Sequence, residues 1–214
     1  MIKAKEVMHI ILVIILFAFI LWFFEDSSLI LSSFIVAVVV ICTNVIAKKI
    51  TARYLQVEAE IKIWEFQRWG YYTRSHFKKP KPIGLILPFL LVFASAPTGF
   101  IKMLTFLQTD ISPTLRRVAK KRGGLKRYYE LTEWHYGWTV AVGILFTLGL
   151  SLLPYIFGKN DILVSIAKYG VYYAIWNMIP IGQLDGTKIF FVGFKFWLFM
   201  VFWVFVAIVL VAFL

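Results

Sequence analysis

The sequence predicts a polytopic α-helical membrane protein, and three observations support this fold class. Of the 214 residues, 61% are hydrophobic and 16% are charged, whereas a soluble domain has about 25% charged and less than half apolar residues. The apolar residues form several runs of about 20, the length that crosses the hydrocarbon core of a bilayer. Most basic residues lie between these runs. We therefore expect lipid to be the solvent for most of the protein surface.

The net charge of +12 is best explained by the membrane as well. Because the basic residues flank apolar runs, we attribute them to anionic lipid headgroups and to the control of topology. The lipid bilayer is thus an expected partner, and nucleic acid is not. The single cysteine, Cys42, excludes an intrachain disulfide and a cysteine-based zinc cluster.

Five apolar runs are predicted to span the membrane within one domain, residues 1–214. Lys3 and Lys5 precede the first run, and Glu25 and Asp26 follow it. Because basic residues favour the cytoplasmic side, the protein is predicted to be an integral, multi-pass membrane protein with its N-terminus in the cytoplasm. The predicted spans cover residues 7–24, 29–47, 136–157, 162–179 and 189–214.

A further apolar segment, residues 83–107, does not fit a simple span. It contains Pro88 and Pro97, and it lies between two basic segments, residues 48–82 and 108–135. A single crossing would place one basic segment outside, against the positive-inside tendency. We therefore predict a re-entrant hairpin that keeps both basic segments on the inner face.

Residues 57–63, with the sequence VEAEIKI, alternate apolar and polar side chains. This period of two is typical of a half-buried strand, although an irregular loop is the alternative. A strand that directly follows a span needs partners for its backbone groups. A small β-sheet at the membrane surface is therefore predicted, with a strand edge that a peptide could join.

The fourth predicted span ends in a polar motif, NMIPIGQLDG over residues 177–186. Pro180 ends or kinks the helix, and Asn177 can bond the carbonyl groups that the break frees. Asp185 is a carboxylate close to the membrane boundary, where an ionised group is costly and usually has a partner. An ordinary helix cap or interfacial turn is the alternative interpretation.

This motif resembles N-x-x-P-x-x-x-L-D-G, one of two signatures of the site-2 protease family of intramembrane zinc metalloproteases. Every defined position matches. The resemblance implies a site-2-protease-like core, in which the aspartate of the motif is the third zinc ligand and the other residues are its scaffold. The matching residues are Asn177, Pro180, Leu184, Asp185 and Gly186.

The other family signature, H-E-x-x-H followed by K-x-T-A-R, is degenerate in this chain. Residues 49–53 match the tail. In that alignment Asn44 and Lys48 replace the two histidines, and Val45 replaces the glutamate. The family's A-G-P-x-x-N sequence is also missing, and the break at residues 94–99 resembles the re-entrant segment only loosely.

These replacements remove the expected chemistry. A valine at the general-base position cannot take a proton from zinc-bound water, an asparagine amide is poorly suited to zinc, and an ammonium has no lone pair. Asp185 is the only matching ligand, so no intact catalytic residue, metal or cofactor is expected. The other side chains that could rebuild a metal site are better explained as solvated or interfacial: His9, His76, His135 and Cys42.

Asn44 and Lys48 are separated by one helical turn and therefore share a face. If the packing resembles that of the family, Asp185 lies at the same depth. We predict that the Lys48 ammonium pairs with Asp185 near the metal position, with Asn44 bridging nearby, since the pair offsets the cost of burying either charge. Alternatively, Lys48 extends to the inner headgroups and never meets Asp185.

The leading hypothesis is a catalytically inactive homologue that binds or regulates membrane proteins without cleaving them. Its protein partner would be a transmembrane segment or peptide of another membrane protein. One alternative is an active zinc-dependent intramembrane endopeptidase with non-standard ligands. Another is a membrane protein with a purely structural role. The last is a small-molecule or ion carrier that uses Asn177, Asp185, Lys48 and Lys168.

Overall fold

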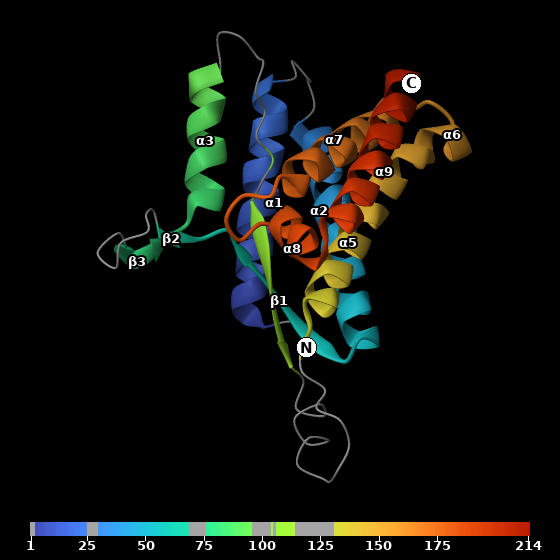
Figure 1. Ribbon diagram of the computed structural model, residues 1–214. Helices are drawn as coiled ribbons and strands as arrows, with labels where there is room; N and C mark the ends of the chain where they lie inside the picture. The colour runs from blue at the N-terminus through green and yellow to red at the C-terminus, as the bar shows by residue number, and fades with distance from the viewer. Residues whose placement is uncertain (1–2, 25–29, 69–75, 96–103, 105, 114–130) are drawn as a thin grey trace.

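Helices form most of the computed structural model, together with two two-stranded sheets, one of which projects from the side of the helical bundle (Figure 1). The structure describes residues 3–24, 30–68, 76–95, 104, 106–113 and 131–214. Its helices are α1 (Ala4–Phe24), α2 (Ile30–Tyr54), α3 (Ile83–Ser95), α5 (Glu133–Gly149), α6 (Leu153–Phe157), α7 (Asp161–Met178), α8 (Asp185–Val192) and α9 (Phe194–Ala212). Its strands are β1 (Val57–Ile63), β2 (Phe66–Arg68), β3 (His76–Lys81) and β4 (Leu107–Pro113).

Within the described residues, four helical segments are long and apolar enough to cross a membrane. They are Ala4–Phe23, Ile30–Tyr54, Glu133–Phe157 and Phe194–Ala212. The prediction of a helical membrane protein is therefore confirmed. The fourth predicted span, residues 162–179, corresponds to α7 but is not among these four. This helix carries Lys168 and Asn177, and it packs against α2, α5 and α9.

Two helices differ in extent from the predicted spans. The second span is predicted to end at residue 47, whereas α2 continues through the buried Lys48 to Tyr54. The predicted span of residues 189–214 is divided into α8 and α9 by Gly193. Hydropathy cannot show this break, since the residues on both sides of it are apolar.

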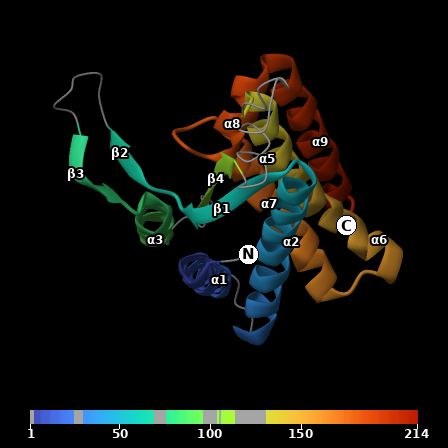
Figure 2. The same cartoon turned by 90° about the horizontal axis from the view of Figure 1, so that it is seen from below.

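The predicted strand is present over residues 57–63 as β1, which pairs antiparallel with β4 from Val57 opposite Pro113 to Ile63 opposite Leu107. The apolar side chains of β1 are buried, and Glu58 on its other face is exposed. This alternation explains why the pattern identified the strand. Neither β4 nor the β2–β3 hairpin was predicted, and Figure 2 shows β2 and β3 extending away from the bundle beyond α3.

The two ends of the segment predicted as a re-entrant hairpin meet at Trp64. The backbone N–H of Gly84, in the first turn of α3, donates to the carbonyl of Trp64, and the Trp64 N–H donates to the carbonyl of Phe106. The 13 residues of α3 extend about 20 Å, less than the roughly 30 Å of a hydrocarbon core. The segment from Gly84 to Phe106 thus begins and ends beside the same residue, Trp64. Most of the break at residues 94–99 lies outside the described residues.

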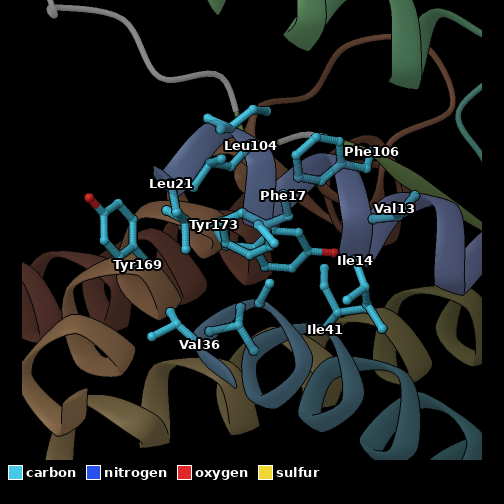
Figure 3. Close-up of a cluster of buried hydrophobic side chains, with 14 of the residues drawn as sticks. Val13, Ile14, Phe17, Leu21, Val36, Ile41, Leu104, Phe106, Tyr169 and Tyr173 are labelled. Carbon is cyan, nitrogen blue, oxygen red and sulfur yellow. The ribbon is translucent and has the colours of Figure 1, made fainter. Parts of the chain in front are cut away.

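Apolar side chains from α1, α2 and α7 form the larger of two helical cores (Figure 3). Phe17 of α1 lies at its centre, with its ring centroid 6.2 Å from that of Tyr173 and 5.6 Å from that of Phe106. A second core joins α5, α7, α8 and α9. Because α7 contributes to both cores, it packs against both α2 and α8.

We expect Gly84→Ala to destabilise the protein by about 1–3 kcal/mol, the usual cost of overpacking. A Cβ atom at this position would collide with the carbonyl of Phe106 and lie 3.0 Å from Trp64. Thermal unfolding in detergent would measure the loss. Gly149→Ala is the control, because nothing lies within 4 Å of a Cβ there. Equal midpoints for both variants would contradict the close packing at Trp64.

Candidate functional site

A buried ion pair joins α2 to α8. The Lys48 Nζ donates to Oδ2 of Asp185, and the two side chains are 0% and 1% exposed. The predicted pairing is therefore confirmed, and the alternative in which Lys48 extends to the headgroups is wrong. Each charge compensates the other, which offsets part of the large cost of removing either one from water.

The stem of Lys48 crosses α5 at Gly143. A Cβ atom at position 143 would lie 2.6 Å from Cγ and 2.8 Å from Cε of Lys48. Only glycine leaves the gap that lets the lysine side chain pass between the two helices. The importance of Gly143 could not be found from the sequence, because the two residues are far apart in the chain and no local pattern connects them.

The motif after α7 positions the carboxylate. Pro180 follows the end of α7, and Gly182 adopts a left-handed φ of +58° in the turn that leads to α8. Asp185 is the first residue of α8. A Cβ atom on Gly186 would collide with the backbone of Met178 and lie 2.8 Å from the carbonyl oxygen of Ile179. The glycine therefore allows the start of α8 to pack directly on the end of α7.

The two asparagines of the site bond to neighbouring helical groups. Asn44 Nδ2 donates to Oγ1 of Thr147 at 3.1 Å, and Asn177 Nδ2 donates to the carbonyl of Tyr173 at 2.8 Å. The predicted bridge from Asn44 to the ion pair is therefore wrong, since the Asn44 amide donates to Thr147 of α5 instead. The Oδ1 atoms of both asparagines and of Asp185 are buried without a protein partner in the described structure.

Val45, at the predicted general-base position, is 6% exposed and belongs to the apolar core with α1. It also lines a cavity of about 260 Å³ between α1, α2 and β1, together with Glu6 and Lys49. Its side chain has no group that could accept a proton. The structure thus assigns Val45 a packing role.

The residues of the site do not fit a zinc ion. An ammonium occupies the partner position of Asp185, and Asn44 contributes a neutral amide. Among the residues that the structure describes, no three His, Cys, Asp or Glu side chains lie close enough to hold a metal. The other candidate ligands lie on separate elements, since His9 is on α1, His76 on β3, His135 at the start of α5 and Cys42 in the core of α2.

Charged side chains cover the edge of β1 that was predicted to accept a peptide. Lys49 Nζ donates to the carbonyl of Ala59 at 2.5 Å, and the N–H of Ile61 donates to Oε1 of Glu6 at 2.8 Å. Lys49 and Glu6 also pair with each other at 2.6 Å. The prediction of a free strand edge on β1 is therefore wrong at these positions, because α1 and α2 supply the missing hydrogen-bond partners.

The outer edge of β4 is covered in a similar way. Lys188 of α8 donates to the carbonyl of Thr109, and the Tyr136 hydroxyl donates to the carbonyl of Ile111 at 3.0 Å. Burial lowers the pKa of Lys188, and the neighbouring carboxylates of Asp185 and Asp110 act in the opposite direction. Lys188 was not predicted as a site residue, although it lies one helical turn after Asp185.

We expect Lys48→Met to destabilise the protein by about 3–5 kcal/mol, because the variant leaves the Asp185 carboxylate buried without its counter-charge. The double variant Lys48→Met/Asp185→Asn should recover at least about 1 kcal/mol of this loss. Chemical unfolding of the two variants and of Asp185→Asn completes a double-mutant cycle. Additive losses would show that the two groups are not coupled.

Comparisons of the chain with protein-family models, with curated proteins and with solved structures found no match. The likeness to site-2 proteases therefore depends on the residues of two motifs, one intact at Asp185 and one degenerate at Asn44, Val45 and Lys48. The family relationship stays a prediction.

Proposed function

We propose that the protein is a catalytically inactive homologue of the site-2 proteases, and that it binds or regulates membrane proteins without cleaving them. The buried pair of Lys48 and Asp185 carries this proposal. In the family, the corresponding aspartate is a ligand of zinc. Here its counter-ion is an ammonium that is covalently attached to α2, so the carboxylate needs no diffusible cation.

The proposal accounts for the unequal preservation of the two motifs. The intact motif has a structural purpose in this chain, because Gly186 packs on the end of α7 and Asp185 holds α2. The positions that would serve only the reaction have changed. Asn44 bonds α5, and Val45 packs against α1. Selection for the fold without selection for hydrolysis would leave this pattern.

We further propose the topology that the basic residues favour, with the N-terminus and the β1–β4 sheet on the cytoplasmic side. In this arrangement α3 enters the membrane from the inner face and the chain returns there. The support is that both ends of this segment bond to Trp64.

The covered sheet edges influence where a partner would bind. A peptide that paired with β1 would have to displace Glu6 and Lys49, and one that paired with β4 would have to displace Lys188 and Tyr136. The helix α9 offers a less costly surface, since only 17% of its apolar stretch is buried in the protein. We therefore propose that a transmembrane segment of the partner packs on the outside of the bundle.

Rebuilding the second motif tests the proposal directly. We expect the variant that combines Asn44→His, Val45→Glu and Lys48→His to bind about one zinc ion per chain, since two imidazoles one turn apart and a carboxylate form a zinc site. Metal analysis of the purified protein by mass spectrometry measures the stoichiometry. Addition of Asp185→Ala to this variant should abolish zinc binding.

The unmodified chain is the second arm of this experiment, and we expect it to bind no stoichiometric zinc. Zinc in the unmodified chain that is lost on Asp185→Ala would instead favour an active enzyme with non-standard ligands. A rebuilt variant that folds, as judged by its thermal unfolding, but binds no zinc would overturn the proposed relationship to the metalloproteases.

A further inference from the structure

An apolar groove lies between α1 and α3. Its volume is about 520 Å³, and every residue that lines it has a hydrocarbon side chain. The rings of Phe19 and Phe89 lie 6.3 Å apart across it. The lining residues are Leu12, Ile15, Leu16 and Phe19 on α1, and Leu85, Ile86, Phe89 and Leu90 on α3.

The dimensions of the groove suit one acyl chain. From Leu12 to Phe19 the groove extends about 10 Å along α1, at 1.5 Å per residue. One leaflet of the hydrocarbon core is about 15 Å thick, half of the roughly 30 Å bilayer core. Ile15 and Leu90 are more than half exposed, at 54% and 57%. The helix α1, which carries Ile15, is long and apolar enough to span the membrane, so an exposed apolar side chain on it contacts lipid.

A basic strand directly precedes α3, one of the two helices that line the groove. Lys78, Lys79 and Lys81 are exposed on β3, and the chain passes from Lys81 through Pro82 directly into α3 (Figure 1). The N-terminus of α3 adds a partial positive charge at the same place. Glu65 is the one acidic residue in the sequence from residue 64 to residue 83, so little negative charge opposes these groups.

We infer that α1, α3 and β3 form a binding site for one anionic phospholipid. Its acyl chain lies in the groove between α1 and α3, and its phosphate contacts the lysines of β3. A neutral phospholipid would fill the groove equally well but gain less from the lysines. The site thus selects for headgroup charge, and it would anchor the β2–β3 hairpin to the membrane surface. The inference is independent of the proposed relationship to proteases.

Native mass spectrometry of the full chain tests this site. The protein is released from bilayers that contain equal amounts of phosphatidylglycerol and phosphatidylcholine. The lipid molecules of each type that remain bound to the protein are then counted. We expect phosphatidylglycerol to be retained over phosphatidylcholine by at least about fivefold. This is the preference that the attraction between one lysine and an anionic membrane surface, about 1 kcal/mol, would give. Equal retention of the two lipids would overturn the inference.

Two variants separate a defined site from diffuse attraction. Lys78→Gln/Lys79→Gln/Lys81→Gln should reduce the preference to near unity. An equal change of charge among exposed cations elsewhere, Lys5→Gln/Arg53→Gln/Lys195→Gln, should leave the preference unchanged. Similar losses in the two variants would show that net charge alone attracts the lipid, and the site would be rejected.

Filling the groove is the last arm of the test. We expect Leu16→Trp/Ile86→Trp to remove one retained lipid of either type, since two indole rings would occupy the space of the acyl chain. Thermal unfolding shows whether this variant is folded, and the single variants replace it if it is not. A folded variant with a blocked groove that retains phosphatidylglycerol as the unmodified chain does would contradict the proposed position of the acyl chain.

Discussion

The ion pair between Lys48 and Asp185 is the constraint on which the rest of the structure depends. Two opposite charges are buried together, so the helices that carry them must meet at one place and in one register. The requirement explains why α2 continues through Lys48, why α5 has a glycine at position 143, and why α8 begins directly against the end of α7. Each of these features allows the Lys48 or the Asp185 side chain to reach the position where the two form the ion pair.

The same principle of internal compensation extends to the sheet. A two-stranded sheet has two open edges, and unpaired backbone groups beside a membrane are costly. Here side chains from four helices supply the missing partners, namely Glu6, Lys49, Tyr136 and Lys188. The outer edges of the β1–β4 sheet are thus covered by side chains of the same chain. Contacts with lipid or with other proteins are therefore left to the outer faces, such as the groove beside α3 and the aromatic surface of α9.

A tethered ammonium differs from a metal ion in a way that bears on function. It neutralises the carboxylate and ties two helices together, but it cannot polarise a carbonyl or activate water as a Lewis acid does. Under the proposed relationship to the metalloproteases, this exchange keeps the architecture of the fold and removes the reaction. The proposed role in binding or regulation follows from this separation between the scaffold and the chemistry.

The amino-acid sequence by itself determined the features that have a local period. The apolar runs predicted the helices, the alternation over residues 57–63 predicted β1, and the spacing of Asn44 and Lys48 predicted that the two residues share a face of α2. The pairing of Lys48 with Asp185 was expected from the family resemblance. Only the tertiary structure decided the partners that are distant in the chain. Strand β4 lacks a clear alternation, the hydropathy does not change at the break before α9, and Asn44 bonds Thr147 because α5 is the nearest neighbour. Such contacts depend on how the helices pack, which no local pattern encodes.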